Sequence, residues 1–216
     1  QLTSLALPSE DWVYEFRYSE NTGLLNSVRV PTGVSFQLDY DARGNLIRFE
    51  DPVFTAESAY NLSYELRGTR SLLTEIRYPN NHTDRFIWSE GDNPLLLAKE
   101  TLAFIGVERD TRTTRYEYNE SGQLIMQVSP DNIATIYEYG SVGYVSALWR
   151  GIILEDGEVR ADIERIRAES VLEFDYDLSG QIQQIRDGRG SLYNIGWNNN
   201  GQIAFVSAPN NTRLDY

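Results

Sequence analysis

The feature that most constrains this sequence is a phrase that recurs at intervals of 21 residues and is clearest at residues 36–52. Aromatic or aliphatic residues at alternate positions (Phe36, Leu38, Tyr40) precede a polar break that ends at Gly44, and a second apolar run follows. Such alternation is typical of a strand with one buried face, and a short break ending in glycine predicts a hairpin. Gly44 stands where the turn needs a positive φ, which glycine adopts without steric cost.

Six glycines hold the same place in this phrase, and an aromatic residue stands four positions before five of them and five positions before the first. A fixed period of this length marks an array of supersecondary units. We therefore expect an all-β chain of hairpins, about 21 residues each, side by side in a long twisted sheet that curls. The repeat residues are Gly23, Gly44, Gly122, Gly143, Gly180 and Gly201, with Tyr18, Tyr40, Tyr118, Tyr139, Tyr176 and Trp197 before them.

The second strand of the phrase carries apolar residues two and five positions after the glycine, as at Leu46 and Phe49. A spacing of three would place them on opposite faces of a flat strand, so we predict a β-bulge between them. We expect the aromatic residues before the turns to be substantially buried. The same holds for the residues two positions after the glycine, namely Leu46, Leu124, Val145, Ile182 and Ile203.

The phrase Tyr-Asp-x-x-Gly-x-Leu resembles the YD repeat of the RHS/YD-repeat proteins. It stands at residues 40–46, and again with Ile182 as its last residue at 176–182, while 118–124 and 197–203 are looser copies. Residues 111–124 also resemble the joint between repeats of bacterial RHS proteins. The family includes bacterial polymorphic toxin shells, insecticidal toxin complex components and the teneurins. The resemblance implies that the repeats spiral into a large hollow shell, of which this chain would be a segment.

We interpret residues 1–216 as a single array of these repeats, interrupted near 53–60, 94–115 and 152–173. After Gly68 the next strand arrives late, which predicts a longer loop. Residues 95–105 are expected to form a strand, with a short helix as the alternative. An extra hairpin is expected around Asp156-Gly157, and the alternative there is a helix that carries Val159, Ile163 and Ile166 on one face.

Neither end of the sequence shows a capping repeat of the kind that solenoids normally need. Tyr216 aligns with Tyr137, a residue in the first strand of a copy. We therefore expect a segment of a larger chain. Its open strand edges would pair with further YD repeats of the same chain or of another copy.

Composition excludes several classes of function. The net charge of −13 argues against nucleic acid, whose phosphates need clustered Lys and Arg, and against an anionic membrane surface. No apolar run approaches the ~18 residues of a membrane helix, so no membrane insertion is expected. The chain has no Cys, which excludes disulfides and thiolate metal sites. Four glycosylation sequons mildly favour a eukaryotic secreted protein and begin at Asn61, Asn81, Asn119 and Asn210.

Residues that could carry chemistry are few. The single histidine, His82, lies in a polar stretch and is expected to be a solvated turn residue. The best metal candidates are two Asp-x-Asp-x-x-Gly segments, which resemble calcium loops but lack the third loop oxygen and the distant glutamate. Asp also favours turns through its own hydrogen bonds, and we prefer that interpretation for Asp39, Asp41, Asp175 and Asp177. No cofactor is expected.

The favoured function is a non-catalytic structural wall in a secreted or cell-surface RHS/YD-repeat protein, either a toxin-encapsulating shell or an adhesion ectodomain. The alternative is a glycan- or protein-binding module that uses exposed aromatic residues or open sheet edges and self-assembles through its ends. Pairs such as Tyr116/Tyr118 and Tyr137/Tyr139 could stack on sugars if they were exposed, but their regular phase favours a core stripe. A hydrolase is not expected.

Overall fold

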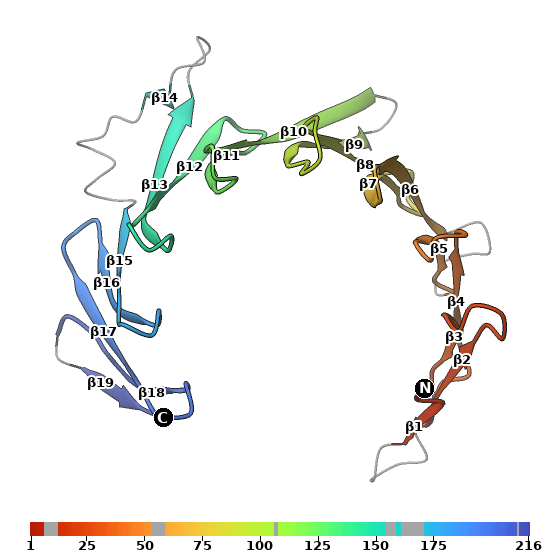
Figure 1. Ribbon diagram of the computed structural model, residues 1–216, viewed down its shortest axis with the longest axis horizontal. Coiled ribbons are helices and arrows are strands. Elements are labelled where there is room, and N and C mark those ends of the chain that lie inside the picture. The colour runs from red at the N-terminus through yellow and green to blue at the C-terminus, as the bar shows by residue number, and fades with distance from the viewer. Residues whose placement is uncertain (7–12, 53–58, 106–107, 154–158, 161–170, 211) are drawn as a thin grey trace. The chain divides into compact units, whose positions relative to one another are not determined.

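The computed structural model describes residues 1–6, 13–52, 59–105, 108–153, 159–160, 171–210 and 212–216, and the described chain is all-β (Figure 1). No helix occurs among these residues. The chain divides into two units, Gln1–Thr113 and Thr114–Tyr216. The division falls inside the strand β10 (Glu108–Tyr118). The expected fold class is confirmed.

In the first unit each strand pairs antiparallel with the next strand in sequence. Glycine turns join the two strands of each hairpin, and further turns or connectors join one hairpin to the next. The strands are β1 (Ser4–Ala6), β2 (Val13–Tyr18), β3 (Leu25–Arg29), β4 (Ser35–Tyr40), β5 (Leu46–Glu50), β6 (Ala59–Arg67), β7 (Arg70–Arg77), β8 (Thr83–Trp88) and β9 (Leu96–Ile105).

The second unit follows the same order with one fork. Beyond Leu148, strand β13 pairs with β14, while β15 pairs with β13 over only two residues, Ala147↔Glu173 and Leu148↔Leu172. The strands after β10 are β11 (Leu124–Val128), β12 (Ile133–Tyr139), β13 (Val145–Ile153), β14 (Val159–Arg160), β15 (Leu172–Tyr176), β16 (Ile182–Asp187), β17 (Leu192–Trp197), β18 (Ile203–Ser207) and β19 (Arg213–Asp215).

Eight hairpins in the described part of the chain carry a β-bulge at the same place, which confirms the prediction from the spacing. In the reference copy Tyr40 pairs with Leu46 and Asp39 with Arg48, so Ile47 is left over and Leu46 and Phe49 return to one face. The residues left over in this way are Asn26, Ile47, Thr74, Leu97, Ile125, Ser146, Gln183 and Ala204. The bulge adds local twist at a constant position in each copy.

The hairpin turns use the backbone conformation that the glycines were expected to supply. Gly44 has a φ of 85°, and its N–H donates to the carbonyl oxygen of Asp41 at 3.1 Å. The N–H of Asp41 in turn donates to the carbonyl of Asn45 at 2.9 Å. The other five repeat glycines also have positive φ, between 70° and 83°. A side chain at these positions would be strained, which explains the fixed place of glycine in the phrase.

The aromatic residues before the turns are half-buried rather than buried in a core, and Ile203 is 40% exposed. The described strands lie side by side in a sheet, so rings pack laterally on neighbouring strands, as in the row Phe36–Phe49–Tyr60–Tyr78 with centroid separations of 5.6–5.8 Å. Among the described residues no large side chain is fully buried, and half of the buried apolar residues are alanines: Ala59, Ala98, Ala134 and Ala147. The opposite face carries ion pairs such as Glu75 with Arg77 and Arg85.

Three expectations about the interruptions have different outcomes. The longer loop after Gly68 is wrong: β6 and β7 continue to the pair Arg67↔Arg70, so Gly68 and Thr69 form a two-residue turn and the hairpin is simply longer. The strand over residues 95–105 is confirmed by β9. The extra hairpin is supported by the pairs Ile152↔Arg160 and Ile153↔Val159, while its turn and residues 161–170 lie outside the described residues.

Candidate functional site

The site that recurs through the molecule is the joint between one hairpin and the next. The last strand of one hairpin pairs with the first strand of the next. This backbone ladder begins two residues after the residue that precedes the bulge, as at Arg48↔Asn61, two residues after Leu46. There the next hairpin supplies a side-chain donor: the Tyr64 hydroxyl donates to the carbonyl oxygen of Leu46 at 3.0 Å. We call such a contact a joint hydrogen bond.

Six joint hydrogen bonds occur at equivalent positions in the described residues, three in each unit. The donor is always the aromatic residue before the turn, and five of the acceptors are the carbonyl two positions after the preceding turn glycine or its structural equivalent. They are Tyr18 to Leu2 (2.8 Å), Tyr64 to Leu46 (3.0 Å), Trp88 to Leu73 (2.8 Å), Tyr139 to Leu124 (2.8 Å), Tyr176 to Val145 (2.7 Å) and Trp197 to Ile182 (2.8 Å). Each bond satisfies a carbonyl at the point where the backbone ladder stops.

Sequence reasoning missed these bonds, although a signal for them exists. The aromatic residue before the turn is Tyr or Trp in every copy, while the eight Phe residues of the chain all stand elsewhere. Tyr and Trp each carry one polar donor on an apolar ring, and Phe does not. Burial raises the pKa of the Tyr176 hydroxyl, and the neighbouring Tyr144 raises it further, so the donor stays protonated at neutral pH.

The four aspartates proposed as metal candidates take turn and surface roles. One carboxylate oxygen of Asp41 accepts the N–H groups of Arg43 and Asn45, both at 2.9 Å, and Asp177 does the same for Ser179 and Gln181. The bonds from the Asn45 side chain and backbone lower the pKa of Asp41. Asp39 lies 3.9 Å from Arg48 in an ion pair. Asp175 lines the cleft described below.

A buried carboxylate that the sequence analysis did not single out lies in the first unit. Asp84 on β8 is only 4% exposed, and it accepts the hydroxyls of Tyr78 at 2.9 Å and Thr101 at 2.7 Å. Lys99 on β9 places its ammonium 2.8 Å from the same carboxylate. Burial alone would raise the pKa of Asp84, but the bonds from Lys99, Thr101 and Tyr78 outweigh burial and lower it. We call these four residues the Asp84 cluster.

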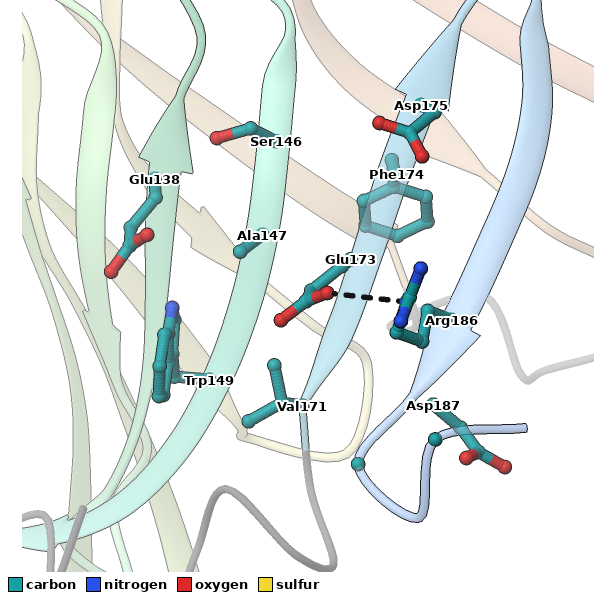
Figure 2. A pocket seen from close by; sticks show the side chains of 12 residues that line it. Glu138, Ser146, Ala147, Trp149, Val171, Glu173, Phe174, Asp175, Arg186 and Asp187 are labelled. Carbon is teal, nitrogen blue, oxygen red and sulfur yellow. Dashed lines mark ion pairs between the residues drawn. The ribbon is translucent and has the colours of Figure 1, made fainter. Parts of the chain in front are cut away.

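A cleft of about 700 Å³ opens on the second unit where β13 forks, and its lining is acidic and aromatic (Figure 2). Strands β12, β13, β15 and β16 contribute Glu138, Trp149, Glu173 and Arg186. In Figure 2 the Glu173 carboxylate lies between the Trp149 indole and the Arg186 guanidinium, with which it forms an ion pair at 3.6 Å. The cleft is thus a polar recess in the sheet, produced by the two-residue pairing of β13 with β15.

The remaining candidate residues are placed singly. His82 is half-buried in the turn between β7 and β8, where its carbonyl accepts the N–H of Tyr78 at 2.9 Å. Of the sequon asparagines, Asn61, Asn81 and Asn210 are exposed, whereas Asn119 accepts the N–H groups of Ser121 and Gln123 within its turn. Within the described part of the chain, no three His, Cys, Asp or Glu side chains gather as a metal site. No described helix could cross a membrane.

Comparison with known proteins identifies the fold. No protein-family model matches the chain, and no curated protein matches it. Crystal structures of TcdB2-TccC3-Cdc42, TcdB2-TccC3-TEV and TcdB2-TccC3 without its hypervariable C-terminal region align with it at TM-scores of 0.62, 0.63 and 0.63. Their identities to this chain are 12%, 13% and 14%, and each alignment covers 98% of this chain and 11% of the other. The chain thus spans about 11% of the length of these proteins and shares their fold.

Proposed function

We propose that this chain is a structural wall, a run of RHS-like hairpins whose task is to extend a continuous β-surface. The observation that carries the proposal is the joint hydrogen bond, which recurs with the same donor position and the same acceptor position in five of the described hairpins. A surface assembled from equivalent joints gains length with each copy, while a catalytic site needs one unique constellation of side chains.

The proposal extends to a non-catalytic wall segment in a larger secreted or cell-surface protein. The resemblance to YD repeats suggests either a shell around a toxic segment or an adhesive ectodomain. The shared fold with TcdB2-TccC3 supports the shell, because those proteins carry the same arrangement of strands within a much longer chain. The half-buried state of Tyr116, Tyr118, Tyr137 and Tyr139 favours a packing role over sugar stacking.

The test is to remove one whole repeat. Deletion of residues 119–139 joins Tyr118 to Gly140, which holds the same place in its turn as Asn119. We expect the shortened chain to remain β-rich and to unfold in a single cooperative transition, followed by circular dichroism during urea denaturation. The joint from Tyr176 to Val145 is kept in this variant, so the following hairpin has its normal acceptor.

The control removes half a repeat. Deletion of residues 119–129 takes out one turn and β11 alone, so every later strand would have to run in the opposite direction to pair antiparallel. This variant is expected to lose its structure. If both deletions were equally harmful, the hairpins would not be interchangeable and the wall proposal would be wrong. With its natural flanking sequence, the chain should form part of a closed, hollow particle in electron micrographs.

A further inference from the structure

The Asp84 cluster stands where the repeat elsewhere places uncharged residues. Asp84 lies four residues before the joint aromatic Trp88, and the same position holds Phe36 before Tyr40 and Tyr60 before Tyr64. The other described copies have Tyr14, Thr114, Thr135, Leu172 and Tyr193 there. Asp84 is therefore the one charged residue at this position among the described copies, and it is one of the most buried side chains of the first unit.

Asp84 on β8 has partners from both neighbouring strands or their ends. Thr101 is directly opposite on β9, Lys99 is two residues earlier on the same strand, and Tyr78 follows β7. Tyr78 is also the last ring of the row that begins with Phe36 and contacts Tyr60 edge to face at 5.6 Å. The row of rings therefore ends at Tyr78, whose hydroxyl donates a hydrogen bond to the Asp84 carboxylate.

The buried Asp84 carboxylate is stabilised only when a strand with suitable polar partners lies beside it. If β8 paired with a strand that carried apolar residues in place of Thr101 and Lys99, the buried carboxylate would face apolar groups, which is strongly unfavourable. Hairpins that share one pattern of apolar residues are otherwise prone to slip by one repeat or to exchange between chains. All eight bulged hairpins described above offer the same pattern of apolar residues and bulge to a wrong partner.

We infer that the Asp84 cluster determines pairing specificity: it matches β8 to β9 and excludes the corresponding strands of other hairpins, of this chain or of a second copy, from that pairing. The inference goes beyond the wall proposal, because it concerns how equivalent strands find their correct partners. Buried polar groups are well suited to this role, since they add little net stability and penalise wrong pairings strongly.

The test separates specificity from stability by making the cluster apolar. In the variant Tyr78→Phe, Asp84→Leu, Lys99→Met and Thr101→Val, every partner is replaced together, so no charge is left buried alone. Replacement of a buried ion pair by well-packed apolar residues is often neutral or stabilising, so this variant is expected to fold with at least the stability of the parent.

Pairing is read out with two cysteines in the naturally cysteine-free chain. Arg85→Cys and Glu100→Cys place thiols on directly opposite residues of β8 and β9. After refolding and oxidation, a disulfide within one chain reports the native pairing, and a disulfide between chains reports exchange, as separated on a non-reducing gel. We expect the apolar variant to raise the fraction linked between chains by about tenfold, equivalent to ~1.4 kcal/mol of lost discrimination.

Two outcomes for the apolar variant would overturn the inference. The first is an apolar variant that refolds with the cross-linking pattern of the parent, and the second is an apolar variant that fails to fold, which would make the cluster a source of stability. Lys99→Arg keeps the ion pair and should retain the parent pattern. Asp84→Asn keeps the shape and removes the charge, so it should give an intermediate fraction, and a fraction equal to the parent's would also contradict the role of the charge.

Discussion

Removal of one joint hydrogen bond is the most direct test of how the hairpins are held together. Tyr176→Phe deletes the hydroxyl that donates to the Val145 carbonyl at 2.7 Å, the shortest of the six joint bonds. The ring itself stays, so its stacked contact with Tyr144 at a centroid distance of 5.0 Å is retained. The substitution therefore isolates the bond from the packing of the ring.

The expected loss follows from the energetics of neutral hydrogen bonds. A typical one contributes about 0.5–1.5 kcal/mol net, and a buried acceptor left unsatisfied costs about 1–3 kcal/mol. Tyr176 and Val145 are half-buried, so water can partly replace the lost donor. We expect Tyr176→Phe to lower the free energy of unfolding by about 1–1.5 kcal/mol. Tyr176→Leu should cost about 0.5–1.5 kcal/mol more, because it also removes the stacking with Tyr144.

Urea denaturation monitored by circular dichroism and Trp fluorescence measures both values. The matched control is Tyr216→Phe, which deletes a hydroxyl from a side chain that is 79% exposed and should change stability by less than ~0.5 kcal/mol. If Tyr176→Phe were as mild as this control, the joint bond would contribute nothing and the backbone ladder alone would connect the hairpins. If the slope of the unfolding free energy against urea concentration is the same in all variants, the measurements compare the same transition.

Three more predictions concern single positions. Gly180→Ala should lower the melting temperature more than Gly122→Ala does, although the two glycines have nearly equal φ values of 81° and 78°. A Cβ at Gly180 would lie 2.7 Å from the Tyr144 ring, whereas none of the described atoms would lie within 4 Å of a Cβ at Gly122. Equal losses would contradict this reasoning. The pKa of Asp84 is lowered below the ordinary 3.8, so its ionised form contributes stability that is complete above pH 3.8 and is lost as pH falls through the folded-state pKa. Asp84→Asn should therefore reduce the loss of thermal stability at acid pH in a series of melts. An unchanged loss would mean that other carboxylates cause it. His82→Ala should change the urea midpoint by less than ~0.5 kcal/mol equivalent, since its backbone and not its ring makes the described turn bond; a larger loss would reveal a role for the imidazole.

The repeated local geometry could be predicted from the sequence because it depends on near neighbours. The turn at Gly44 follows from the polar break and the need for positive φ, and the bulge at Ile47 follows from the spacing of Leu46 and Phe49. The same information gives the hairpin order, because antiparallel neighbours joined by short turns must be adjacent in the sheet.

Burial and the special positions could not be predicted in the same way. The tyrosines were expected in a core, but a sheet whose rings pack sideways leaves them half-exposed. A longer loop was expected after Gly68 because the next apolar run begins late, but the polar residues Arg70 and Ser71 before that run also lie in the ladder. The Asp84 cluster depends on Lys99 and Thr101, which follow 15 and 17 residues later and meet Asp84 only through the register of β8 and β9.

The position of the joint bonds along the strands has a mechanical consequence. Where they occur, they lie near the glycine-turn end of the hairpins, two residues beyond the start of the ladder, while the opposite end is held by backbone pairing and a connector. A force that separates two hairpins meets an additional fastening at one end only. Separation of two hairpins should therefore start at the connector end and proceed towards the glycine turns. A strained sheet would then open along the edge that carries the connectors, while the edge that carries the glycine turns stays paired.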